Sequence, residues 1–186
     1  MIPHMYTLTQ RDEQVLRWQL KGTTDAVAGI FEKCDYGFPQ IVLLSPQAGS
    51  TVDYQSLSNI LWLTCPYLND EIHELENKGY IAKIETFINT DEVLKREMLK
   101  AHSHFYFFRK SVYEKYIHKE IEDEYLHVMK RGIGGLQEPV HLKCLHLHYA
   151  HYRICESNIA GRIVYHLLQQ KVNCDDAICR VSLQKG

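Results

Sequence analysis

Residues 59–79 read NILWLTCPYLNDEIHELENKG, and this stretch predicts which kinds of element build the fold. The apolar run at 59–65 has the length of a buried strand. Pro66 ends that run and suits the first turn of a helix. Leu68, Ile72 and Leu75 then recur at helical spacing as far as Gly79, a residue common at helix ends. The stretch therefore predicts that a strand leads directly into a helix.

The flanking segments extend this pattern in both directions. A helix is predicted from Thr9, a possible N-cap, to Leu20, and two strands are predicted in DAVAGIFEKC (25–34) and FPQIVLLSP (38–46). Helical spacing continues through residues 90–131 with a break expected near 115–119, and further helices are expected at 141–155 and 158–170. We predict an α+β fold: a small N-terminal antiparallel sheet of about three strands packed with a predominantly helical second half. Residues 1–170 are expected to form a single globular domain, and residues 171–186 a C-terminal tail that can be loose.

Composition narrows the class of protein. Hydrophobic residues make up 45% of the chain and charged residues 24%, as in soluble globular proteins. A formal net charge of -2 argues against a broad nucleic-acid surface, and no apolar run approaches the ~20 residues that cross a bilayer. The first residues resemble no secretory signal, so a cytoplasmic location is expected. In that reducing compartment the six cysteines are expected to be free thiols, metal ligands or buried apolar groups rather than disulfides.

The segment KCLHLHYAHYRIC, residues 143–155, concentrates groups that bind metals or protons. If it is helical, Cys144, His148, His151 and Cys155 share one stripe, and His146 points to the opposite side. Cys144 and Cys155 would lie roughly 16 Å apart, so one ion can take only neighbours from this stripe. Cys34 and Cys65, at expected strand ends, could complete a zinc site. The sequence has no Cys-x-x-Cys pair, the spacing typical of a structural zinc site. The alternative is that these side chains are buried and hydrogen-bonded to their neighbours without a metal.

Two other chemistries are open. The segment RGIGG, residues 131–135, offers backbone N–H groups, to which cationic side chains could add charge for binding an anion. Alternatively, Cys65 or Cys144 could act as a nucleophile beside His146 or His148. Cys65 is favoured for that role because Pro66 would place it at a helix N-terminus, where the helix dipole stabilises a thiolate.

Several motifs together resemble one known family. CDYGFPQIV, LWLTCPYLNDEIHELENKG, RGIGG, KCLHLHYAHY and NIAGRIV, in this order across residues 24–170, resemble the bacterial family catalogued as domain of unknown function 501. Relatives tend to have proline after the asparagine of the last motif, where this chain has Ile159, although Asn158 can still cap a helix. The resemblance implies no established reaction. It implies a shared polar site and a bacterial cytoplasmic protein.

Two classes of function follow. The first is a small enzyme acting on an anionic small molecule, with zinc as the possible cofactor. Its candidate groups are catalytic Cys65, His146 and His104; anion-binding Arg109, Arg131, Gly134, Gly135, Lys143 and Asn158; and metal-binding Cys34, Cys65, Cys144, His148 and His151. The second is a non-catalytic module that binds a protein partner, in which the same cysteines and histidines form a structural metal site or a polar core. An open coordination position or a pocket would favour the first. No nucleic-acid or membrane partner is expected, and the oligomeric state is not indicated.

Overall fold

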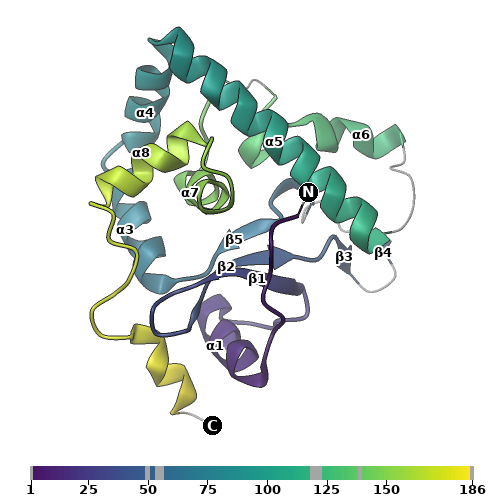
Figure 1. Cartoon of the computed structure of the whole chain (residues 1–186), viewed down its shortest axis with the longest axis vertical. Helices are drawn as coiled ribbons and strands as arrows, with labels where there is room; N and C mark the ends of the chain where they lie inside the picture. The colour runs from purple at the N-terminus through teal and green to yellow at the C-terminus, as the bar shows by residue number, and fades with distance from the viewer. Residues whose placement is uncertain (1, 49–50, 53–56, 118–122, 138–139, 185–186) are drawn as a thin grey trace.

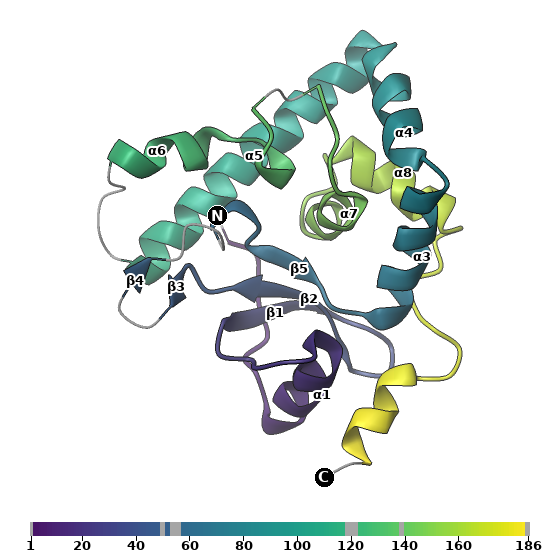
Figure 2. The same cartoon turned by 180° about the vertical axis from the view of Figure 1, so that it is seen from behind.

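A computed structural model describes residues 2–48, 51–52, 57–117, 123–137 and 140–184. The predicted α+β fold is confirmed: β1 (Val27–Lys33), β2 (Pro39–Leu44) and β5 (Leu61–Leu63) form an antiparallel sheet in the order β1-β2-β5. Two very short strands, β3 (Gln47–Ala48) and β4 (Thr51–Val52), pair with each other outside it. Helices cover both faces of the three-stranded sheet (Figures 1 and 2).

The central strand β2 explains this layering. All six of its residues are buried, as expected for a strand covered on both faces. Ile41 and Leu43 belong to the main core on the side of the helical second half, whereas Val42 and Leu44 pack with Leu16 of α1 (Gln10–Leu20). The predicted cap of α1 is confirmed, since the Thr9 side chain and Asp12 form a capping box.

The remaining helices lie on the same side of the sheet as α7 (Leu145–Ile154), which is seen end-on in the middle of both cartoons. They are α3 (Pro66–Asn77), α4 (Tyr80–Asn89), α5 (Glu92–Ile117), α6 (Asp123–Lys130) and α8 (Ile159–Leu167). Two 3-10 helices, η1 (Ile133–Gly135) and η2 (Ile178–Leu183), complete the described helical elements. The long helical stretch does divide, because α5 ends at Ile117, but residues 118–122 lie outside the described part of the chain. None of the helices in the described ranges is both long and apolar enough to cross a membrane.

One expectation about α7 is wrong. Cys144 and Cys155 do not lie on the helix but flank it as N-cap and C-cap, both with extended backbone dihedrals. The predicted stripe therefore shrinks to His148 and His151, which are fully buried. The two cysteines instead leave the helix at its two ends, and each joins a different group of side chains.

Candidate functional site

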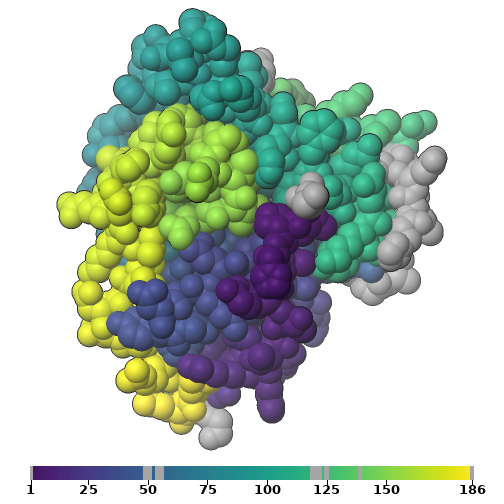
Figure 3. Space-filling model, in the orientation of Figure 1, coloured from purple at the N-terminus to yellow at the C-terminus, as the bar shows by residue number. Residues whose placement is uncertain are grey.

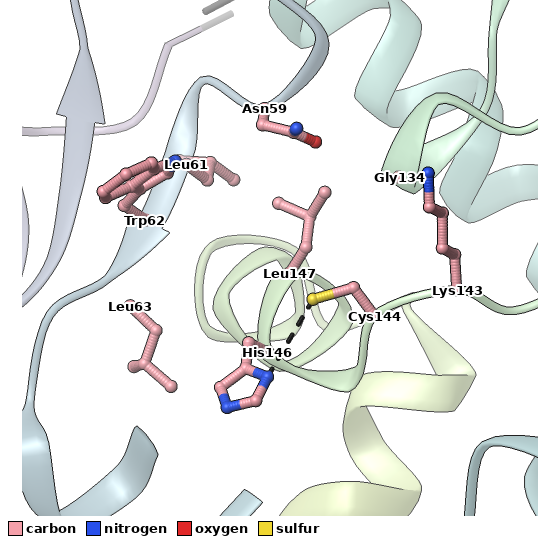
Figure 4. Close-up of a pocket in the computed structure, with 9 residues that line it drawn as sticks. All are labelled: Asn59, Leu61, Trp62, Leu63, Gly134, Lys143, Cys144, His146 and Leu147. Atoms are coloured by element: carbon pink, nitrogen blue, oxygen red, sulfur yellow. Dashed lines mark hydrogen bonds between the residues drawn. The ribbon is translucent and has the colours of Figure 1, made fainter. Parts of the chain in front are cut away.

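The N-terminal end of α7 opens onto a pocket of about 270 Å³ between β5 and η1 (Figure 4). Its apolar wall comes from β5 and from Leu147, and its polar groups come from the residues around the start of α7 and from Asn59. The lining residues are Asn59, Leu61, Trp62, Leu63, Gly134, Lys143, Cys144, His146 and Leu147. The pocket thus places a thiol, an imidazole and an ammonium group beside an apolar surface.

A carboxylate from α3 organises the polar end of the pocket. Glu76 Oε1 accepts the Leu145 N–H at 2.7 Å, which satisfies a free donor of the first turn of α7. The same oxygen lies 3.3 Å from His146 Nδ1, and Cys144 Sγ lies 3.9 Å from that nitrogen. The donor atoms of Glu76, Cys144 and His146 all lie within 4.8 Å of one another.

The other nitrogen of His146 determines which atom faces this group. His146 Nε2 lies 3.2 Å from the Asn69 carbonyl oxygen, which can only accept, so Nε2 carries the hydrogen. Nδ1 is left facing both the thiol and the carboxylate. Burial of the ring opposes protonation, but the hydrogen bonds to Cys144 and Asn69 and the charge of Glu76 outweigh it and raise the pKa of His146.

A second group lies at the opposite end of α7, where donor atoms of His104, His151 and Cys155 also lie within 4.8 Å of one another. His104 Nδ1 and His151 Nε2 are 2.9 Å apart. Asn158 caps α8 by accepting the Gly161 N–H on Oδ1 at 3.0 Å, so its Nδ2 donates to His151 Nδ1, also at 3.0 Å. His151 Nε2 must then carry the hydrogen and donate it to His104. Burial foremost, and then the charge of His104, hold the pKa of His151 well below its usual range.

The two groups therefore differ in protonation. In the first, a backbone carbonyl holds the far N–H of the imidazole and the near nitrogen faces the other donors, which is the usual arrangement of a metal-binding histidine. In the second, a proton occupies the space between the two imidazoles. His148 joins neither group; burial lowers its pKa to about 3, and it is neutral at physiological pH.

The structure does not bring the predicted metal ligands together. Cys144 lies at the pocket and His151 at the other end of α7, while Cys34 and Cys65 lie near the C-terminal segment. Cys65 does lie at the N-terminus of α3, at the N-cap position, as expected, but it is buried, and burial raises the pKa of its thiol to about 11. Burial thus removes the thiolate advantage that the helix N-terminus suggested for Cys65 as a nucleophile.

The predicted anion-binding residues are also divided among several places. Gly134 and Lys143 line the pocket, and Gly135 follows Gly134 in η1. Asn158 instead contacts His151 in the second group, at the opposite end of α7. Arg131 lines a different pocket of about 470 Å³ between α5 and the loop after α6. Arg109 is fully buried and donates to the carbonyl groups of Val128, Met129 and Arg131, so it caps the end of α6.

Glu76 and Asn69 are the site residues that sequence reasoning missed. Both lie within LWLTCPYLNDEIHELENKG, so the family motif held a signal, but nothing in their spacing indicated contact with His146.

A family profile described as protein of unknown function (DUF501) matches residues 30–166, which is more than half of the chain. The chain belongs to this family. The DUF501 match spans Asn69, Glu76, Cys144 and His146, and its description assigns no reaction. No curated protein and no solved structure matches the chain.

Proposed function

We propose that the protein is a small zinc-dependent enzyme in which Glu76, Cys144 and His146 hold the metal and the adjoining pocket binds an anionic small molecule. The observation that carries this proposal is the cluster of three donor atoms within 4.8 Å at the wall of a pocket. Thiolate, imidazole and carboxylate are the ligands that zinc takes in proteins. Three protein ligands leave a fourth position for water, which zinc would activate for hydrolysis.

The contacts of His146 favour a metal over nucleophilic catalysis by Cys144. In a catalytic triad, the nucleophile and the orienting acid contact opposite nitrogens of the imidazole. Here Cys144 and Glu76 approach the same nitrogen, and a backbone carbonyl takes the other. Zinc–nitrogen and zinc–oxygen bonds of about 2.0–2.2 Å place two ligand atoms about 3.4 Å apart in a tetrahedron, close to the 3.3 Å between His146 Nδ1 and Glu76 Oε1.

The rim of the pocket supports an anionic substrate. Lys143 precedes Cys144, and its side chain extends toward Gly134 of η1 (Figure 4). None of the ion pairs within the described ranges involves Lys143, so its charge is available to a ligand. Leu61, Leu63 and Trp62 would contact an apolar portion of the same molecule. A small carboxylate or phosphate with a hydrocarbon part fits these walls.

Metal analysis of protein purified without an affinity tag or chelator tests the metal site. We expect about one zinc per chain, lost in Cys144→Ser and Glu76→Gln but retained in Cys155→Ser, the same substitution in the group whose tautomer opposes a metal. Cobalt substituted for zinc should show sulfur-to-metal charge transfer that Cys144→Ser abolishes. Folded protein that binds neither ion, or zinc that persists in Cys144→Ser, would overturn the proposal.

Anion binding is tested on the cobalt protein. Added acetate or phosphate should change its visible spectrum if the fourth position is open. Lys143→Met should weaken that binding about three- to fivefold, the effect of one exposed ion pair worth up to ~1 kcal/mol. A spectrum unchanged by either anion would instead indicate a closed site, as in a partner-binding module with a structural metal.

A further inference from the structure

The C-terminal segment is fastened to the turn that follows β1. Asp35 N–H donates to Asn173 Oδ1 at 3.1 Å, and Asn173 Nδ2 donates back to Asp35 Oδ2 at 2.8 Å. The Tyr36 hydroxyl donates to the Asp175 carbonyl at 2.9 Å. Figure 3 shows this segment, in yellow, lying along the blue and purple N-terminal part of the surface. Because residues 173 and 175 bond to residues 35 and 36, the segment that carries Cys174 lies against the turn that begins at Cys34.

Two glutamine side chains connect Cys65 and Cys179 to the same region, the junction between the C-terminal segment and the first strands. Gln40 Nε2 donates to the Val172 carbonyl at 2.6 Å and lies 3.9 Å from Cys65 Sγ. Gln19 Nε2 donates to Cys179 Sγ at 3.2 Å and to the Pro39 carbonyl at 2.9 Å. Each sulfur is therefore next to a side-chain amide donor, a contact that stabilises a thiolate more than a thiol.

Electrostatics supports the same grouping. Burial foremost raises the pKa of the Cys65 and Cys179 thiols, and neighbouring thiolates would raise it further: those of Cys179 and Cys34 at Cys65, and those of Cys34 and Cys174 at Cys179. Cys34 also packs against the apolar cluster that contains Cys179. All four are free thiols. The fold thus brings four cysteines from three segments distant in sequence to one junction. Apolar packing alone does not require cysteine at these four positions.

We propose that Cys34, Cys65, Cys174 and Cys179 bind a four-iron iron–sulfur cluster. A single zinc ion, with zinc–sulfur bonds of about 2.3 Å, needs its thiolates about 3.8 Å apart. Among the described residues, no three of these four cysteines have their sulfurs all within 4.8 Å of one another. In a four-iron cluster each thiolate binds a different iron, so the sulfurs are spread more widely. The amide donors of Gln19 and Gln40 would then stabilise the charged ligands.

Anaerobic purification, followed by analysis of iron and acid-labile sulfide, tests this proposal. We expect about four of each per chain and a broad visible absorption, with at least a tenfold loss of bound iron in Cys174→Ser and in Cys179→Ser. Cys155→Ser is the matched control and should retain the cluster. Circular dichroism shows whether a variant that loses iron is still folded.

Three results would overturn the proposal: wild-type protein that holds no iron or sulfide even after reconstitution with both, zinc in place of iron that Cys174→Ser removes, or a disulfide within the four in the intact mass of anaerobic protein. The cluster proposal and the zinc proposal can be refuted independently of each other. Cys144→Ser removes zinc and leaves iron and sulfide unchanged, whereas Cys174→Ser does the reverse.

Discussion

Substituting Gly161 with alanine should destabilise the protein through the contact between α7 and α8. Gly161 lies in the first turn of α8, and a Cβ there would stand 2.2 Å from the His148 carbonyl oxygen and 2.4 Å from Tyr152 Cβ. Carbon atoms in contact normally lie about 3.5–4.0 Å apart, so α8 would have to move away by more than ~1 Å. Neither opposing atom can rotate aside, because one belongs to the backbone and the other is attached directly to it.

The magnitude follows from two opposing effects. Overpacking costs about 3 kcal/mol at the upper end of its range, which applies here because the obstacles are rigid. Alanine favours a helix over glycine by about 1 kcal/mol. We therefore expect Gly161→Ala to lower the free energy of unfolding by about 2 kcal/mol or more, and the melting temperature by about 4–8 °C.

Urea unfolding followed by circular dichroism measures the effect against a matched variant. At Gly22 an added Cβ would meet only the Leu20 carbonyl oxygen, at 3.8 Å, so Gly22→Ala should leave the unfolding midpoint nearly unchanged. Equal midpoints for the two variants would refute the packing argument. Because α7 carries the pocket residues, Gly161→Ala should also reduce bound zinc.

Three further results are expected. Burial keeps His151 neutral in the fold, while the unfolded chain binds a proton below about pH 6.5; the free energy of unfolding should therefore fall as the pH drops from 6.5 to about 5, and less steeply in His151→Gln. Arg109→Met should cost about 2–3 kcal/mol, because two buried carbonyl groups and one partly buried carbonyl group lose their donor and the removed charge offsets only part of the loss. Hydrogen exchange should show lost amide protection in α6 but not elsewhere. Asn158→Asp keeps the cap of α8 but accepts from His151 Nδ1, which frees Nε2, so zinc content should rise by up to one equivalent, and an unchanged content would contradict the assigned tautomer.

Much of the sheet and of α1 could be predicted because local signals agree there. Thr9 and Asp12 cap α1, and β2 is a continuous apolar run between a turn and a polar loop. By contrast, α4 was not predicted, since it begins at Tyr80 directly after Gly79 and has no capping side chain. The ends of α7 were misplaced for a related reason: the Cys144 side chain makes no capping bond, so spacing alone extended the helix too far.

The candidate site was predictable only in its local part. Cys144, His146 and Lys143 are neighbours in sequence, and their concentration was apparent. Glu76 reaches His146 from 70 residues away, and only the packing of α3 against α7 creates that contact. The same limit applies to the C-terminal segment, whose contacts with residues 35 and 36 span well over a hundred positions.

The bonds between the Asp35 turn and Asn173 have a consequence for how the protein is made. Their partners are separated by 138 residues, so β1 and its turn leave the ribosome many seconds before Asn173 does, at synthesis rates of about 5–20 residues per second. During that interval Cys34 and Cys65 stand without the two cysteines that later join them. The junction can close only after Cys179 has been made, so an inorganic centre that uses all four cysteines must be loaded after that point.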